Sequence, residues 1–293
     1  MISQKIQIKP EDICTECKSP ISASLRCCPT CKADLGAPNV RLCKSDENSN
    51  ALNARYQNAC KKATSEKCLK TFKELEEAIK KNSVVVITMP ASVARNLFEN
   101  PVYLYNNYEN LVGANIRTPA VFNDDRQRSV VGACLFGSYA NCIVYGALSL
   151  ATEGLPTYGE LCCRLKNKAI EKRTSFLETN SFKFVEEHNI TASKGLPLGY
   201  MACWEQRHLL VLIKLAERIS DGQTESEWQE LLIQSDSQNR KNDDFIEAHI
   251  YDNLNRYAVE AVVQCRSKKL NKAQQLDIDL AIESFNKIGA SRS

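Results

Sequence analysis

Residues 244–251, DFIEAHIY, are the stretch on which the interpretation of this sequence depends. Phe245, Glu247 and His249 alternate with purely apolar residues, and such an alternation predicts a β-strand with two different faces. A carboxylate among apolar neighbours is costly to bury unless it has a partner or a function. The pattern leaves two interpretations open: a functional acid near the centre of a sheet, or the polar face of an edge strand.

The remaining chain predicts a mixture of strands and helices. VVVITM at residues 84–89 is a β-branched run that indicates a buried strand. Shorter strand-like segments are expected at 129–137 (SVVGACLFG), 159–165 (GELCCRL) and 174–177 (TSFL), and helices at 50–81, 208–219, 225–234 and 270–288. Strands without a regular βαβ alternation predict an α+β fold.

The chain divides into three predicted segments. Residues 1–36 are rich in Cys, Pro and Ser and poor in large apolar residues, so a metal must replace a hydrophobic core there. Residues 37–83 are expected to form a polar linker, up to residue 49, followed by the helical segment. Residues 84–293 are expected to form one domain that ends in the C-terminal helix.

Two C-x2-C pairs predict a zinc ribbon. Cys14-Thr-Glu-Cys17 and Cys28-Pro-Thr-Cys31 are ten residues apart, and four thiolates complete a tetrahedral Zn²⁺ site. Such a site has no open position, so its zinc is expected to be structural. Cys27 is a spare thiol that replaces Cys28 if the register shifts by one residue.

Composition restricts the classes of partner. The net charge is only +3, with 38 basic and 35 acidic residues, and this balance argues against a dedicated nucleic-acid binder. No apolar run reaches the ~18 residues that span a bilayer, and the first residues lack the apolar stretch of a signal peptide. The nine cysteines beyond residue 31 are expected to be reduced and mostly buried thiols.

Three segments carry a resemblance when taken together and in order. They are Leu135–Tyr139 with Tyr145-Gly-Ala-Leu-Ser-Leu150; Thr157–Lys166 with Arg173-Thr-Ser-Phe176 and Asn180-Ser181; and Asp244–Tyr251. The chain resembles, over about residues 84–262, an uncharacterised bacterial family that also occurs as toxin modules. This family is similar to divergent members of the NAD-dependent ADP-ribosyltransferase superfamily.

The resemblance implies an ADP-ribosyltransferase-like mixed β core with NAD as substrate. Glu247 is then the acid that stabilises an oxocarbenium-like state, as in glycoside cleavage. Arg173, Thr174 and Ser175 correspond to the superfamily's Ser-Thr-Ser strand. His249 shares a predicted face with Glu247. Tyr145-Gly146 and Tyr158-Gly159 are either walls of the NAD site or turn and core residues.

The sequence departs from the superfamily pattern at two places. The usual early-strand Arg or His that holds the NAD phosphates has no counterpart in residues 102–109, which leaves Tyr108, Arg117 and Arg128 as candidates. Phe245 stands two residues before Glu247, where enzymes that modify arginine have Glu or Gln. The acceptor therefore stays open, with arginine as a guess.

We expect a mono-ADP-ribosyltransferase that modifies a protein side chain and releases nicotinamide. The resemblance implies a bacterial effector or toxin, made in the cytoplasm without a classical signal peptide and translocated into a host or competitor cell. The alternative is a non-enzymatic adaptor that binds a protein or nucleic acid through its zinc ribbon, with a degenerate transferase fold behind it.

Overall fold

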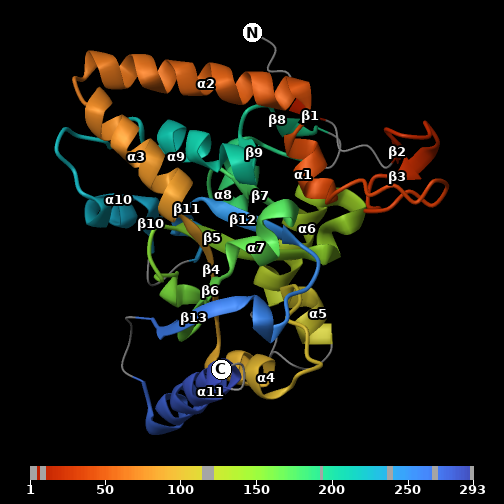
Figure 1. The fold of residues 1–293 in the computed structure, drawn as a ribbon, viewed down its shortest axis with the longest axis vertical. Coiled ribbons are helices and arrows are strands. Elements are labelled where there is room, and N and C mark those ends of the chain that lie inside the picture. Colours follow the sequence, from red (N-terminus) through yellow and green to blue (C-terminus); the bar gives the residue numbers. More distant parts are fainter. Residues whose placement is uncertain are drawn as a thin grey trace.

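The computed structural model describes residues 5–6, 11–113, 122–191, 194–235, 240–265 and 270–290. Its centre is a seven-stranded sheet in which all neighbouring strands are antiparallel (Figure 1). From edge to edge the strands are β13 (Val259–Gln264), β6 (Leu161–Leu165), β4 (Val84–Met89), β5 (Ile143–Ser149), β12 (Glu247–Tyr251), β7 (Thr174–Leu177) and β9 (Met201–Cys203). The predicted α+β class is confirmed.

Helices cover both faces of this sheet. The first face packs its apolar residues against α2 (Asp46–Ser65), α3 (Leu69–Asn82), α4 (Ala91–Glu99), α9 (Arg207–Leu215), α10 (Glu225–Leu232) and α11 (Lys272–Ala290). The second face is covered by α1 (Pro38–Cys43), α6 (Phe122–Phe136), a 3-10 helix, η1 (Gly137–Cys142), and α8 (Ser181–Glu187). Two short helices, α5 (Tyr108–Gly113) and α7 (Asn167–Ile170), complete the set of α-helices within the described ranges.

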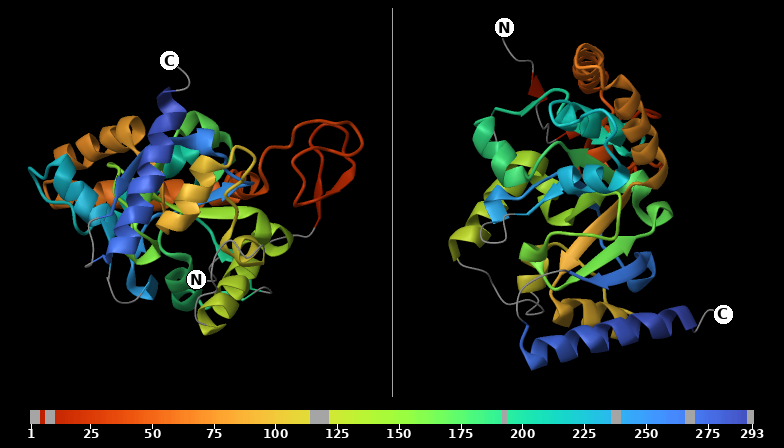
Figure 2. Two further views of the ribbon diagram at one scale, coloured as in Figure 1. Left: turned by 90° about the horizontal axis from the view of Figure 1, so that it is seen from below. Right: turned by 90° about the vertical axis from the view of Figure 1, so that its left-hand side faces the viewer.

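Three two-stranded ladders lie outside the main sheet. β2 (Glu11–Ile13) pairs with β3 (Pro20–Ser22) in the cysteine-rich segment, residues 11–36, which we call the cysteine unit. β1 (Lys5–Ile6) pairs with β8 (Leu196–Pro197), and β10 (Ile233–Gln234) pairs with β11 (Asp244–Phe245). Figure 2 shows that the cysteine unit projects from the body of the protein. No described helix has the length and apolar character to cross a bilayer.

Within residues 244–251, Glu247–Tyr251 form the predicted strand, β12, whereas Asp244 and Phe245 belong to the separate ladder of β11 with β10. Strand β12 lies inside the sheet between β5 and β7, so the edge-strand interpretation is wrong. Ile246, Ala248 and Ile250 join the core of the first face, whereas Phe245 packs on the second. The strands expected at 84–89, 159–165 and 174–177 are confirmed in position.

Three local predictions need correction. Residues 129–137 form the end of α6 and the start of η1, because Val131, Cys134 and Leu135 recur at helical spacing and are buried together. Residues 50–81 contain two helices, α2 and α3, which are separated by a turn at residues 66–68. Residues 37–49 are no linker: they form α1 and begin α2.

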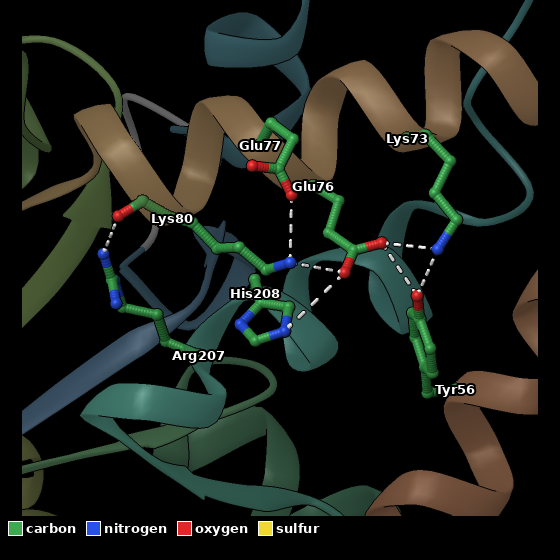
Figure 3. A network of polar contacts seen from close by, with 7 residues as sticks. All are labelled: Tyr56, Lys73, Glu76, Glu77, Lys80, Arg207 and His208. Carbon is green, nitrogen blue, oxygen red and sulfur yellow. Dashed lines mark hydrogen bonds and ion pairs between the residues drawn. The ribbon is translucent and has the colours of Figure 1, made fainter.

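Helices α2, α3 and α9 are joined by a polar network around Glu76 (Figure 3). The Glu76 carboxylate is 7% exposed and accepts hydrogen bonds from Lys73 (2.7 Å), Lys80 (2.8 Å) and the Tyr56 hydroxyl (2.8 Å). Burial opposes its ionisation, but the two lysines lower the pKa of Glu76 to about 2. The Nε2 atom of His208 lies 3.9 Å from the same carboxylate.

The burial of His208 predicts that the folded protein loses stability in acid. Burial and the Lys80 charge lower its pKa from 6.5 to about 4, so the folded state binds this proton less readily than the unfolded state. Stability from this site is complete above pH 6.5 and is lost as the pH falls toward 4. Between pH 6.5 and pH 4, the free energy of unfolding of His208→Gln should therefore decrease by ~2 kcal/mol less than that of the unmodified protein. Chemical denaturation of both proteins at pH 7 and pH 4.5 measures this difference. The same decrease in the free energy of unfolding in both proteins would contradict the prediction.

Candidate functional site

Glu247 lies on the second face of the sheet, at the start of β12. Its cross-strand partners are Ala147 on β5 and Leu177 on β7, so these three side chains share one face. The residue is only 6% exposed. Because the side chain of Ala147 is small, it leaves open space next to the carboxylate.

Two cavities meet at Glu247. The larger, of about 110 Å³, is bordered by Thr88 of β4, Tyr145 of β5, Tyr158 and Glu247, and also by Arg128 and several polar residues. The smaller, of about 60 Å³, shares those first four residues and is otherwise lined mainly by apolar groups: Val86, Gly146, Ala147, Leu155 and Phe245. We call them the polar cavity and the apolar cavity. A buried carboxylate with aromatic and cationic neighbours around open space is a candidate site.

His249 is a positioning residue for this carboxylate. It is fully buried, and its Nε2 lies 3.0 Å from Oε2 of Glu247. The rings of Phe136 and Tyr145 contact the imidazole edge-on, with centroids 4.8 Å and 5.4 Å away. Since a carboxylate accepts hydrogen bonds, Nε2 is the donor in this pair, and Nδ1 has no hydrogen-bond partner among the described residues.

The start of α8 supplies the second hydrogen bond to Glu247. The Ser181 backbone N–H donates to Oε2 at 3.1 Å. Asn180 caps this helix by accepting from Phe182 N–H at 3.0 Å. Ser181 and Phe182 both border the polar cavity. Asn180-Ser181 belongs to the segments that carry the resemblance. The Ser181 N–H could not be identified as a donor from the sequence, because every residue except proline has a backbone N–H.

Tyr158 is held at the cavities by the glycine that follows it. A Cβ on Gly159 would lie 2.1 Å from the Met89 carbonyl carbon, so only glycine allows this close approach to the end of β4. Burial and the Glu247 charge raise the pKa of Tyr158, which keeps its hydroxyl protonated. The sequence left open whether Tyr145 and Tyr158 are walls of a binding site or turn and core residues. In this structure both border the cavities.

Arg128 alone among the three phosphate-binding candidates can be placed. It extends from α6, borders the polar cavity and is close enough to influence Tyr158 electrostatically. Arg117 lies outside the described residues. Tyr108 belongs to α5, and its side chain is likewise outside the described part of the structure.

The structure does not bring Arg173, Thr174 and Ser175 to the cavities. Arg173 donates to the backbone carbonyls of residues 251–253 beyond β12. Thr174 pairs with Ile250, faces away from Glu247, and donates to the Ile170 carbonyl at 2.8 Å. Ser175 pairs with His249 but is covered by α1. Their hydroxyl and guanidinium groups support the sheet instead of lining the site.

Asn39, which lies in the segment expected to be a linker, braces strand β12. Its Nδ2 donates to the His249 carbonyl at 2.8 Å and to the Ser175 hydroxyl at 3.0 Å, with a longer bond to the Arg173 carbonyl. The side chain is fully buried. Helix α1 therefore fixes the strand that carries Glu247.

The four predicted zinc ligands come together in the cysteine unit. The sulfurs of Cys14, Cys17, Cys28 and Cys31 all lie within 4.8 Å of one another, and two S–S separations are 3.6 Å. A tetrahedral site with Zn–S bonds of ~2.3 Å needs S–S separations of ~3.8 Å. This cluster could therefore hold a metal such as zinc.

The two cysteine turns have the same backbone conformation. Lys18 and Lys32 follow the second cysteine of each pair with φ of 60° and 63°. Their N–H groups donate to the carbonyls of Cys14 (3.0 Å) and Cys28 (2.9 Å). Among its described side chains the unit buries three, those of Cys14, Cys28 and Ile21, so a metal held by the four cysteines would supply stability that so small a core does not.

Arg41 fastens the cysteine unit to α1. Its guanidinium donates to four backbone carbonyls of the unit, at Ala23, Leu25, Leu35 and Gly36. The Tyr251 hydroxyl, from the end of β12, adds a bond of 3.0 Å to the Ser24 carbonyl. The metal cluster is thus joined through short paths to the strand of Glu247.

No protein-family model matches this chain, and the search of curated proteins gives no match. The function must therefore be argued from the site itself.

We expect Cys28→Ser to release a bound zinc ion and Cys27→Ser to retain it. Cys28 belongs to the cluster, whereas the thiol of the neighbouring Cys27 donates to the backbone carbonyls of Cys28 and Lys32. Removing a thiolate ligand should also expose residues 11–36 to amide exchange. Metal analysis and hydrogen exchange measure both effects. Retention of zinc by Cys28→Ser with loss in Cys27→Ser would show that the ligand register is shifted.

Proposed function

We propose that this protein cleaves NAD at the bond between nicotinamide and ribose and transfers ADP-ribose to a nucleophile, as an ADP-ribosyltransferase does. The observation that carries the proposal is the buried Glu247 carboxylate where the polar and apolar cavities meet. Departure of nicotinamide leaves positive charge on C1′ and the ring oxygen of the ribose. A fixed carboxylate in a water-poor cavity stabilises that charge more strongly than water does.

The surroundings of Glu247 suit the parts of this substrate. The apolar cavity, with Tyr145, Tyr158 and Phe245, offers aromatic walls for a nicotinamide ring. In the polar cavity, Arg128 supplies a cation for the pyrophosphate. His249 and Ser181 N–H bind Oε2 and so fix the orientation of the carboxylate before substrate arrives.

The acceptor is proposed only as a class. Phe245 is 3% exposed and belongs to an apolar cluster, so no second carboxylate stands two residues before Glu247 to activate a guanidinium. Arginine is therefore the less favoured acceptor. If the acceptor of ADP-ribose is a protein side chain, the protein is an effector or toxin of the kind that the resemblance implies. If the acceptor is water, the protein is an NAD glycohydrolase.

Glu247→Gln tests the proposed chemistry. The amide keeps the shape of the side chain but removes its charge, so we expect the rate of nicotinamide release to fall by ~10²-fold or more while KM changes little. Release from labelled NAD, with and without a cell lysate as acceptor source, measures it. Glu260→Gln, an exposed change on edge strand β13, is the control. Absence of NAD cleavage and label transfer by the unmodified protein would contradict the proposal.

Arg128→Gln separates binding from chemistry. Loss of a cation that pairs with phosphate oxygens is expected to raise KM for NAD by ~10-fold or more and to leave kcat within ~3-fold. Arg95→Gln on α4, where the arginine pairs with Glu99, is the matched control. An unchanged KM in Arg128→Gln would exclude this residue as the phosphate ligand.

A second role is favoured by the surface of the cysteine unit. Ile13 is 63% exposed and Leu25 is 36% exposed, which suits docking of a protein partner beside the metal cluster. Deleting residues 1–36 tests whether partner binding and NAD cleavage separate. The deletion must stop before Asn39, because that side chain braces β12. An adaptor loses partner binding, whereas the enzyme keeps NAD cleavage.

A further inference from the structure

The two cavities at Glu247 are too small for a whole dinucleotide. Their volumes are about 110 and 60 Å³, whereas sites for small organic ligands and cofactors enclose ~300 Å³ or more. If NAD binds as proposed above, a large part of it must lie outside them. A neighbouring groove of about 450 Å³ between α6 and α8 offers that space.

This groove adjoins the polar cavity. Val131 of α6 and Phe182 of α8 border both hollows. On α6, Gln127, Val130 and Val131 face the groove at helical spacing, whereas Arg128, Val131 and Gly132 face the polar cavity. On α8, Phe182, Val185 and Glu186 line the groove in the same way.

We infer that the α6–α8 groove binds the adenosine end of NAD. The inference rests on the proposed function and adds a subsite to it. In this arrangement Glu247 lies beside the nicotinamide ribose and Arg128 beside the pyrophosphate, and the adjoining groove receives the adenosine.

The chemistry of the groove suits a purine nucleoside. The side chains of Val130, Val131, Phe182 and Val185 form its floor and walls, and an aromatic ring among aliphatic groups favours stacking of a planar base. Gln127, Glu186 and Lys241 are exposed at its rim. An amide can pair with the edge of adenine, and a carboxylate can accept from ribose hydroxyl groups.

Val130→Glu tests the groove without touching the site of cleavage. Val130 is 56% exposed, so the substitution leaves the core intact, and a carboxylate there opposes a stacked base and the nearby phosphates. Leu276→Glu is the matched control: Leu276 is 58% exposed on α11, which packs against α4 away from α6 (Figure 1). The measurements are KM and kcat for NAD and the inhibition constant of nicotinamide mononucleotide, which lacks the adenylate.

We expect Val130→Glu to raise KM for NAD by ~10-fold and to leave kcat and the inhibition constant of the mononucleotide unchanged. Leu276→Glu should resemble the unmodified protein. If Val130→Glu leaves KM unchanged while Glu247→Gln abolishes cleavage, the adenosine site lies elsewhere and only this inference fails. Equal weakening of NAD and the mononucleotide also overturns it. If the unmodified protein neither binds nor cleaves NAD, the proposed function fails together with the inference.

Discussion

A carboxylate buried in the middle of a sheet face requires hydrogen-bond donors, and the structure around Glu247 satisfies this requirement from two directions. His249 lies two residues along the same strand, and Ser181 N–H comes from the start of α8. Burying an unpaired charge at this depth would cost several kcal/mol. That cost is a large fraction of the ~5–15 kcal/mol by which a typical domain is stable. The two donors restrict the carboxylate to one orientation, so the need for stability also prepares it for a substrate.

The same strand is also held by α1, which in turn binds the cysteine unit. Asn39 holds the His249 carbonyl, and Arg41, two residues later on α1, holds four carbonyls of the cysteine unit. A segment with so small a core has little stability of its own. A metal held by the cysteine unit would therefore add to the rigidity of α1, and through Asn39 to the fixed position of β12. Bracing of this kind needs no contact between the metal and the substrate.

Sequence patterns could reveal the parts of this arrangement that depend on local periodicity or fixed spacing. The alternation around Glu247 and the two cysteine pairs are of this kind, and both have their predicted structure. The partners of Glu247 could not be predicted in this way. Ser181 acts through its backbone, Asn39 lies in a segment whose polar composition resembles a linker, and Thr88 becomes a neighbour only because β4 pairs with β5.

The failure at residues 129–137 has a physical cause that bears on the site. Val130, Val131 and Phe136 have high strand propensity, but propensity is a weak constraint when a helical face can be buried. As a helix, the segment directs Arg128 to the polar cavity and Val130 to the groove beside α8. A strand would place neighbouring residues on opposite faces and could not line two adjoining hollows with one short segment.

The division of the two sheet faces separates stability from chemistry. The first face buries most of the large apolar side chains, and the Glu76 network links three helices on that side. The second face holds smaller apolar clusters and the cavities at Glu247. Substitutions that remove a charge at the cavities leave the larger core in place, and effects of distant, unconnected sites add independently. Loss of function in such variants can therefore be separated from loss of folding.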